Sequence, residues 1–478
     1  MSKRPNILLI TTDQQRFDTI AALGNRHIYT PHLDWLVDEG ITYTRAYSDA
    51  PVCMAARATM MTGKSGYNAG LSNNATSVVP MQKYPTLPGL LTQAGYQTRA
   101  QGKMHFQPMR ANYGFEHMEL PMDYYRERHR NAHQGLPKEH GVGENEITPV
   151  ISTVDEVHSL TYWTVRRSID FLETRDETRP FFLWTSFAKP HPPFDPCANY
   201  WALYQNLSLP DPVLGDWSET VETMPQAYLA PTYMLNNAYR MSNEQLREVK
   251  RAYYACITQI DYHLGLLFAR MREMGLLENT WILFTSDHGE MLGDHHMAAK
   301  SLFLEGSAHV PLLIRPPASS WDEKPLAGKQ VDTLVNLADI FPTILQRADV
   351  SLPDDHDGLD LLSLVDSPKA RDFYGMYGDS FHCLIQGKHK YHWARAGGEE
   401  LLFNLENDPL EQHNLAVSEQ AATVLQTMRQ ELMQRMMAHN SPCIVAGQLK
   451  PGPAISGPKD VTKWPGFHST VVNSDVLH

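Results

Sequence analysis

Short apolar runs recur along the first two thirds of the chain, and each gives way to polar residues at its end. They cover residues 6–12, 96–100, 180–187, 281–285 and 310–315. An apolar run of this length, without alternation, is typical of a strand that is buried on both faces of a parallel sheet. We therefore predict that these runs are strands of one large sheet.

Segments of helical length lie between the apolar runs. They cover residues 31–39, 53–63, 86–94, 153–174 and 242–274, and residues 41–47 alternate like a further strand. Two helices carry clear start signals, because Pro31 follows Thr30 at a first turn and Ser242 with Gln245 can form a capping box. Helices that alternate with buried strands predict an α/β fold, with a large, mostly parallel mixed sheet flanked by helices.

The pattern changes in the last quarter of the chain. Residues 353–360 are acidic and loop-like, strand-like pieces follow at residues 373–377, 389–393 and 401–404, and a helix follows at residues 418–438. We interpret Glu399 and Glu400 as a solvated turn, and the last forty or so residues, rich in Pro, Gly and Ser, as an extended arm. These features predict an N-terminal domain over residues 1–365 and a smaller C-terminal α+β domain with an extended tail over residues 366–478.

Residues 196–241 have weak periodicity and several prolines, which predicts an insertion over the functional site. Its aromatic residues either stack on a sugar or aryl group or serve as packing residues: Trp201, Tyr204, Trp217 and Tyr228. The methionines of the last helix are predicted to be packing residues: Met428, Met433, Met436 and Met437.

Polar residues of catalytic type follow the predicted strands. They are Asp13 and Gln14, then Lys103 and His105, then His191, and finally Asp287 and His288 with Lys300 further on. In open parallel sheets, ligands bind beyond the carboxyl ends of the strands, so we expect these side chains to converge. Lys103 and His105 are two positions apart and share a face if their segment is extended. Asp294, His295 and His296 either line the same pocket or lie on the surface.

Cys53 stands at the end of a loop, directly before a helix-forming run. If the helix begins there, its free N–H groups and positive dipole end favour an anion at the cysteine. Arg57 lies four positions on, shares the cysteine's face and can fork onto the same anion. The alternative for a lone cysteine is a buried structural role, and the other polar residues in order favour a functional site.

The stretch from Cys53 to Arg57 resembles the Cys-x-(Pro or Ala)-x-Arg signature of the type I, formylglycine-dependent sulfatases of the alkaline phosphatase superfamily. The order of the site residues resembles sulfatases over residues 5–315, with residues 102–106 and 287–300 particularly similar to bacterial arylsulfatases and choline sulfatases. Residues 401–415 resemble the sulfatase C-terminal domain. In this family the cysteine is oxidised to formylglycine, whose hydrate is the nucleophile. Ala55 at the third position goes mostly with radical-dependent maturation in anaerobes.

The resemblance implies a metal site and a set of catalytic residues. The implied metal ligands are Asp13, Gln14, Cys53 as formylglycine, Asp287 and His288, and the implied catalytic residues are Cys53, Arg57, Lys103, His105, His191 and Lys300. Oxygen ligands favour Ca²⁺, while the nitrogen of His288, where many sulfatases have asparagine, leaves Mn²⁺ or Zn²⁺ open. By resemblance, Lys103 contacts the sulfate or the nucleophile and His105 takes a proton from the hydrate. His191 and Lys300 would then protonate the leaving alcohol.

The reaction implied by the resemblance is hydrolysis of a sulfate monoester of a carbohydrate or another small alcohol. His288 motivates an alternative, a phosphonate monoester or phosphodiester hydrolase, because some sulfatases and the related phosphonate monoester hydrolases have histidine there. A third hypothesis is a non-catalytic binder of sulfated ligands, in which Cys53 stays a thiol because Ala55 replaces proline. The retention of the other catalytic residues argues against this third hypothesis.

Composition and charge narrow the range of partners. The chain has 478 residues with 42% hydrophobic and 20% charged residues, as in globular proteins. A net charge of −13 argues against nucleic-acid binding and requires a local basic pocket for an anionic substrate. The five scattered cysteines predict no disulfide scaffold. Without a visible leader or membrane segment, we expect a cytoplasmic protein whose partners are a sulfate ester and a maturase, with association into a homo-oligomer through the C-terminal arm.

Overall fold

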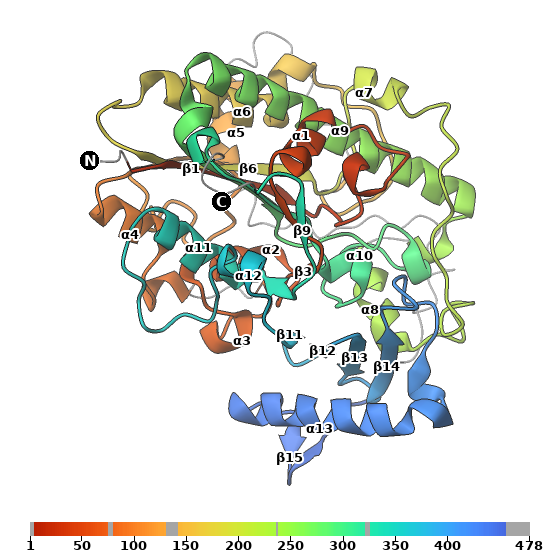
Figure 1. Ribbon diagram of the computed structural model, residues 1–478. Helices are drawn as coiled ribbons and strands as arrows, with labels where there is room; N and C mark the ends of the chain where they lie inside the picture. The colour runs from red at the N-terminus through yellow and green to blue at the C-terminus, as the bar shows by residue number, and fades with distance from the viewer. Residues whose placement is uncertain (1–3, 75–79, 131–141, 236–237, 321–325, 456–478) are drawn as a thin grey trace.

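A computed structural model describes residues 4–74, 80–130, 142–235, 238–320 and 326–455 of the chain. Its centre is an eight-stranded sheet in the order β5-β4-β6-β1-β7-β8-β2-β9 (Figure 1). The strands are β1 (Asn6–Asp13), β2 (Ile41–Tyr43), β4 (Gln97–Gly102), β5 (His117–Glu119), β6 (Phe181–Pro190), β7 (Thr280–Ser286), β8 (Leu312–Arg315) and β9 (Lys329–Val331). The five strands from β5 to β7 pair in parallel, while β8 is antiparallel to both β7 and β2. The predicted α/β fold with a mostly parallel mixed sheet is confirmed.

Helices cover both faces of this sheet (Figure 1). One face packs against α1 (Pro31–Asp38), α6 (Leu160–Thr174) and α9 (Asn243–Glu273), and the other against α2 (Cys53–Thr62), α4 (Leu87–Gln93) and α11 (Ile340–Arg347). In β1, Leu8 and Ile10 contact the first layer and Ile7 and Leu9 contact the second. Because both faces are buried, the strands have no polar side, which explains their continuous apolar sequences.

Two predicted elements of the large domain differ clearly from the structure. Helix α6 begins at Leu160 rather than residue 153, because the hydroxyl of Ser159 accepts a hydrogen bond from the Tyr162 N–H and caps the helix there. The single strand predicted over residues 41–47 is two short strands in different sheets, β2 and β3 (Ala46–Tyr47), the latter paired with β10 (Val335–Asn336). The chain changes sheets at Thr44 and Arg45.

A smaller C-terminal domain is present, as predicted. It contains a four-stranded antiparallel sheet of β11 (Phe373–Tyr377), β12 (Phe381–Gln386), β13 (His389–Ala394) and β14 (Glu399–Asn404), covered by α13 (Ala422–Ala438). Interpreting Glu399 and Glu400 as a solvated turn was wrong, because they begin β14 and Glu400 forms an ion pair with Arg429. The boundary between residues 365 and 366 stays a prediction, and much of the predicted tail, residues 456–478, lies outside the described residues.

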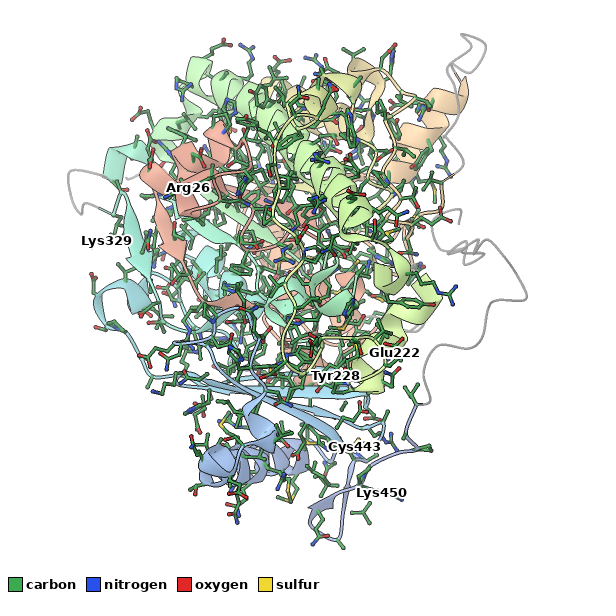
Figure 2. All side chains as sticks on the ribbon, turned by 90° about the vertical axis from the view of Figure 1, so that its right-hand side faces the viewer. Arg26, Glu222, Tyr228, Lys329, Cys443 and Lys450 are labelled. Carbon is green, nitrogen blue, oxygen red and sulfur yellow. The ribbon has the colours of Figure 1, made fainter. Side chains whose placement is uncertain are left out.

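The C-terminal sheet is buried on both faces. One face packs on α13, where Met428 and Met436 are buried and Met437 is exposed. The other face packs on the large domain, through residues that include Trp217 and Tyr228 of the predicted insertion. Figure 2 shows Tyr228 on the side of this sheet that faces the large domain and Cys443 on the opposite side. The C-terminal domain therefore packs on the insertion and on the segment that follows β7 in the large domain.

The insertion's aromatic residues serve mainly as packing. Tyr204 and Tyr228 are fully buried, and Trp217 stacks on His295 with ring centroids 4.5 Å apart. Residues 198–209 pack on α9, and residues 217–229 pack between the loop after β7 and the C-terminal sheet. The five cysteines lie within the described residues, and all are buried and free. Within the same described residues, no helix combines the length and apolar character needed to cross a bilayer.

Candidate active site

Four neighbouring parallel strands deliver polar side chains to one edge of the sheet. Asp13 ends β1, Lys103 follows β4, His191 follows β6, and Asp287 with His288 follows β7. Cys53 is the first residue of α2, and its helix points its N-terminus at the same edge. The sequence therefore predicted the convergence correctly, because the carboxyl ends of adjacent parallel strands meet at one place.

Four side chains form a tight, fully buried cluster. One ligand atom each from Asp13, Cys53, Asp287 and His288 lies within 4.8 Å of the others. The Cys53 Sγ lies 3.6 Å from Asp13 Oδ1 and 3.2 Å from His288 Nε2. Ligands bound at about 2.0–2.6 Å from one ion are less than about 5 Å apart. The donor set and its spacing therefore fit a single divalent cation.

The orientation of the His288 ring supports this fit. Its Nδ1 lies 2.9 Å from the carbonyl oxygen of Gly289 and so carries a proton. The other nitrogen, Nε2, points into the cluster, 3.7 Å from Asp287 Oδ1. Burial opposes a charge on this ring, but the neighbouring Asp287 and Cys53 raise its pKa. The position at Nε2 thus favours positive charge, either a proton or a metal cation.

Arg57 lies beneath the cluster. Its Nε donates to Asp287 Oδ2 at 2.8 Å, and Nη1 donates to the Lys103 carbonyl at 2.6 Å and to Ser186 Oγ at 2.7 Å. Its Nη2 lies 3.5 Å from Asp13 Oδ2. Arg57 was expected to fork onto a bound anion. Its donors are instead directed at acceptors of the protein itself. In this arrangement the guanidinium holds the two carboxylates in place and offsets their charge.

Cations next to Cys53 set its electrostatics. Lys103 Nζ lies 2.7 Å from Asp13 Oδ2. Burial by itself would raise the pKa of Asp13, but Lys103 and other nearby cations hold that pKa well below its usual range. Burial likewise opposes ionisation of the Cys53 thiol, yet Lys103 and Lys300 hold its pKa well below its usual value. Burial and the Asp13 carboxylate raise the pKa of Asp287. Position 53 therefore lies where negative charge is stabilised.

Gln14 and Lys300 are linked by a chain of hydrogen bonds. Gln14 has φ 73°, and its side-chain oxygen accepts from Lys300 Nζ at 2.6 Å. Its amide nitrogen donates to the buried carboxylate of Glu290, which also accepts from the backbone of Leu292 and Ala299. This fixes the amide with its oxygen towards Lys300, beside the cluster.

His191 is held as a neutral ring. Its Nδ1 donates to the Pro192 carbonyl at 2.8 Å, and its Nε2 accepts from Lys300 Nζ at 2.9 Å. Burial and the charges of Lys300 and Lys103 push the pKa of His191 well below its usual range. In this pair, Lys300 therefore donates the hydrogen bond and His191 accepts it.

The expectation that Lys103 and His105 share a face of an extended segment is wrong. Gly102 has φ +100°, and His105 has φ 58°, so the chain turns sharply here. A Cβ at Gly102 would lie 1.9 Å from the Ser186 carbonyl oxygen, so β4 can approach β6 this closely only with glycine. The buried Nδ1 of His105 has no hydrogen-bond partner within the described residues.

Sequence reasoning missed three supporting residues. Ser186 links Arg57 to the Lys103 carbonyl, Glu290 orients Gln14, and the Tyr253 hydroxyl donates to the Gln14 carbonyl at 2.6 Å. Glu290 had a signal, because it lies three residues after Asp287. Tyr253 had none, because it lies in the middle of the long helix α9.

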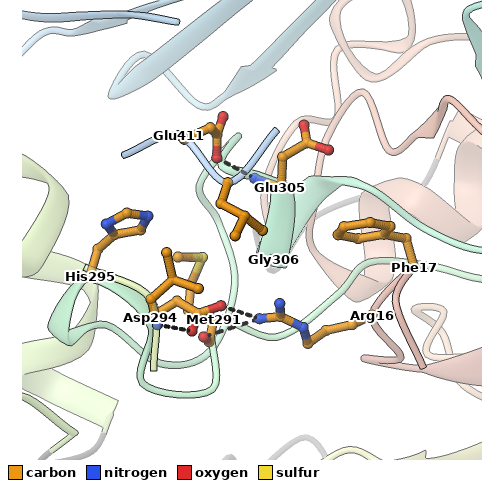
Figure 3. A pocket seen from close by; sticks show the side chains of 10 residues that line it. Arg16, Phe17, Met291, Asp294, His295, Glu305, Gly306 and Glu411 are labelled. Atoms are coloured by element: carbon orange, nitrogen blue, oxygen red, sulfur yellow. Dashed lines mark hydrogen bonds and ion pairs between the residues drawn. The ribbon is translucent and has the colours of Figure 1, made fainter. Parts of the chain in front are cut away.

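Asp294 and His295 have packing roles rather than a place in the cluster. Arg16 Nη1 donates to Asp294 Oδ2 at 2.8 Å, and the His295 ring hydrogen-bonds Ser218 Oγ at 2.8 Å, while His296 is half-buried. Figure 3 shows this region, a cavity of about 10 Å³ that has room for about one water molecule. It is lined by Arg16, Phe17, Val213, Met291, Asp294, His295, Glu305, Gly306, Leu410 and Glu411, so it lies apart from Cys53.

Comparison with known proteins agrees with this geometry. The family model described as "Sulfatase" matches residues 5–350, and one described as "N-sulphoglucosamine sulphohydrolase, C-terminal" matches residues 293–438. An arylsulfatase of Clostridium perfringens is 34% identical, covering 96% of this chain and 100% of that protein. A choline-sulfatase of Rhizobium meliloti is 31% identical, with 86% and 82% covered. The solved phosphonate monoester hydrolase of Agrobacterium radiobacter is 25% identical with a TM-score of 0.78, covering 91% of this chain and 96% of that one.

Proposed function

The chain belongs to the sulfatase family of sulfuric ester hydrolases, and we propose that it hydrolyses a sulfate monoester of a carbohydrate or small alcohol with a formylglycine made from Cys53. The observation that carries the proposal is the buried cluster of Asp13, Cys53, Asp287 and His288 beside two lysines. Oxidation of Cys53 to the aldehyde would supply a hydrate whose hydroxyl is the nucleophile. A maturase is then the required partner.

Asp13, Asp287 and His288, with Gln14 at the margin, are the residues that would hold a divalent cation. When bound, that cation supplies charge neutralisation for the sulfate oxygens and lowers the pKa of a hydroxyl at position 53. The carboxylates favour Ca²⁺, and the His288 nitrogen is compatible with Mn²⁺ or Zn²⁺. Arg57 keeps both carboxylates oriented towards the cluster.

The remaining residues divide the binding and proton-transfer tasks. Lys103 and Lys300 are the cations that can bind the sulfate oxygens, since both act on the charge at Cys53. Lys300 also donates to the neutral His191, so we assign Lys300 as the proton source for the leaving alcohol and His191 as the residue that positions it. His105, whose Nδ1 has no partner in the part of the chain that the structure describes, is assigned as the base that removes a proton at position 53.

The test uses protein made together with a formylglycine-generating maturase. Release of sulfate from 4-nitrophenyl sulfate and from sulfated sugars is measured, and intact mass reports the oxidation of Cys53. Cys53→Ala is expected to lower kcat by at least about 10⁴-fold, as for the loss of other nucleophiles. Cys256→Ala, at another buried cysteine outside the cluster, is the matched control and is expected to stay active. Activity in Cys53→Ala, or an active enzyme with a thiol at position 53, would contradict the proposal.

A second candidate is a phosphonate monoester or phosphodiester hydrolase on the same scaffold. His288 points Nε2 into the cluster, and the similar solved structure from Agrobacterium radiobacter is a phosphonate monoester hydrolase. Sulfate and phosphonate groups are both tetrahedral anions, so the same cations can bind either one. The values of kcat/KM for matched aryl sulfate, aryl phosphonate and phosphodiester substrates decide between the two, and the preferred ester is the one with the highest value.

A further inference from the structure

Glu290 is a fully buried carboxylate that forms no ion pair within the described residues. Its oxygens accept hydrogen bonds from N–H groups instead. One oxygen accepts from the backbone N–H groups of Leu292 and Ala299, and the other accepts from the side-chain amide of Gln14. A buried carboxylate without a cation is costly, so a neutral amide of the same shape would be expected here if the side chain only filled space.

The segment that carries Lys300 is held in a strained conformation beside this carboxylate. Ala299 has φ 67° and Ser301 has φ 77°, left-handed values that are uncommon for residues other than glycine. The Ala299 N–H donates to Glu290 Oε1 on one side. The Ser301 N–H donates on the other side to the carbonyl of Pro51, in the loop before α2, at 3.0 Å. Glu290 therefore holds the backbone next to Lys300 as well as the amide that Lys300 contacts.

Gln14 connects Glu290 to Lys300, and its amide can face only one way. Its backbone is fixed, because its N–H donates to Asp287 Oδ1 at 3.1 Å and its carbonyl accepts from the Tyr253 hydroxyl at 2.6 Å. The amide nitrogen donates to Glu290, and the amide oxygen accepts from Lys300 Nζ at 2.6 Å. Turning the amide over would set its NH₂ group against the ammonium and its oxygen against the carboxylate.

Donors stand at both ends of this hydrogen-bond chain, two backbone N–H groups at one end and the Lys300 ammonium at the other. The single amide between them offers one donating side and one accepting side. The side chain at position 290 must therefore accept on both of its sides, which a carboxylate does and an amide cannot. We propose that Glu290 is a positioning residue that fixes the direction of the Gln14 amide and so holds Lys300 in place for the leaving alcohol. This inference rests on the proposed sulfatase function.

The test moves the carboxylate from one position of the chain to the next. Glu290→Gln keeps the shape but leaves two N–H donors facing each other, whichever way either amide is turned, so kcat/KM is expected to fall about 10–100-fold. Gln14→Glu alone sets two buried carboxylates against each other and is also expected to lower kcat/KM. In the double variant, the amide at position 290 can donate to the carboxylate at position 14, which also accepts from Lys300. At least about tenfold of the loss should then return.

A comparison of leaving groups separates positioning from general damage to the site. 4-Nitrophenolate leaves without being protonated, whereas an alkoxide needs the proton assigned to Lys300. In Glu290→Gln, kcat for the faster of propyl sulfate and glucose 6-sulfate should therefore fall at least about tenfold more than kcat for 4-nitrophenyl sulfate. Glu39→Gln is the control, because its partner Arg315 lies beside the start of β7, at the edge of the sheet away from the site. It should change neither rate.

Crystal structures of the variants separate this inference from the catalytic proposal, because they need no turnover. In Glu290→Gln, Lys300 Nζ should lose its contact with Gln14 or with His191 Nε2, which lies 2.9 Å away in the wild type. The double variant should restore both contacts. If the wild type releases no sulfate but these changes appear, the catalytic proposal fails and the positioning role stands.

Three results would overturn the inference. Lys300 could keep both contacts in Glu290→Gln, the losses of the single variants could simply add in the double variant, or both kinds of ester could slow equally in Glu290→Gln. If Glu290→Gln does not fold, the double variant decides, because it is expected to fold with its hydrogen-bond chain complete and a double variant that does not fold refutes the chain.

Discussion

A buried lysine joins the two domains, and replacing it gives a quantitative test of how they are held together. Lys390, on β13 of the C-terminal sheet, is fully buried and contacts Glu305 at 2.6 Å and Glu411 at 2.9 Å. Glu305 belongs to the short helix α10 (Glu305–Ala308) of the large domain, on the loop that also carries Lys300. His309 Nδ1 lies 2.6 Å from Glu305 Oε2, and the Tyr47 hydroxyl donates to Oε1 at 3.0 Å. The perturbation is Lys390→Met, which keeps the length of the side chain and removes its charge.

The expected loss follows from what the substitution leaves behind. Two carboxylates remain at a buried interface without their shared cation, and removing one partner of a buried ion pair costs about 3–5 kcal/mol. Lys388→Met is the matched control, two residues earlier. Lys388 is 50% exposed and its partner Glu406 is 64% exposed, so that pair contributes about 0–1 kcal/mol. The difference between the two variants should therefore be at least about 2 kcal/mol.

Urea unfolding measures this difference, followed both by circular dichroism and by tryptophan fluorescence. Lys390→Met should lower the midpoint strongly at pH 7 and Lys388→Met should scarcely change it. The effect should also depend on pH. Burial raises the pKa of Glu411, but Lys390 holds it below the usual value, as it does for Glu305, so the stabilisation by these pairs is present above the carboxylates' unfolded pKa of about 4.5. It is lost as the pH falls through their lower folded values, so the difference between wild type and Lys390→Met should shrink below pH 4.5.

The reasoning about charge is checked by adding Glu411→Gln to Lys390→Met. If the loss comes from carboxylates left without a cation, neutralising one of them should recover part of it, as a coupling of about 0.5–3 kcal/mol. Equal midpoints for the two lysine variants would refute the estimate of the buried pair. A further loss on adding Glu411→Gln would refute its electrostatic origin.

Three further predictions concern the cluster and its surroundings. Chelators should lower both the activity and the melting temperature, and added Ca²⁺ or Mn²⁺ should restore both. His288→Ala should weaken metal affinity by about 10–100-fold in a calorimetric titration. Arg57→Lys should lower kcat/KM by about 10²-fold or more, because an ammonium cannot replace the guanidinium fork on two carboxylates, and normal kinetics would contradict its positioning role. Burial raises the pKa of Asp49 to about 7, so the native state binds its proton more tightly than the unfolded state and stability falls as pH rises from 4 to 7. Asp49→Asn should therefore stabilise the protein at pH 8 by up to about 4 kcal/mol and much less at pH 5, as read from urea midpoints.

The sequence predicted the parts of the fold in which burial is complete. Strands β1, β6 and β7 were recognised because both of their faces are covered and each contains an unbroken apolar run. The edge strands β5 and β9 were not, because each has three residues and at least one exposed side chain, which leaves little pattern. Strand β12 was missed because its apolar run is interrupted by His382, which is buried with its Nδ1 3.0 Å from the Tyr374 hydroxyl oxygen.

The same limit applies to the candidate site. Residues that follow strand ends were predicted to converge, since the sheet alone brings them together. The pairing of Lys390 with Glu305 was not predicted, because these residues are 85 positions apart and meet only when the two domains dock. The roles of Arg57 and His105 also depended on local backbone and hydrogen-bond geometry that spacing does not encode.

The charges around position 53 explain how, under the proposed function, one residue could serve both as a metal ligand and as a nucleophile. On one side lie Asp13, Asp287 and His288, which together favour a cation, and on the other lie Lys103 and Lys300, which favour an anion. If those three side chains held a cation, an anionic oxygen at position 53 would be attracted from both sides, whereas the Asp13 carboxylate by itself opposes negative charge there. Lys103 also contacts Asp13 at 2.7 Å and so couples the two sides. Removing Lys103 should therefore weaken both the binding of a sulfate ester and the ionisation of the group at position 53, whereas removing Lys300 should act on the ester side first.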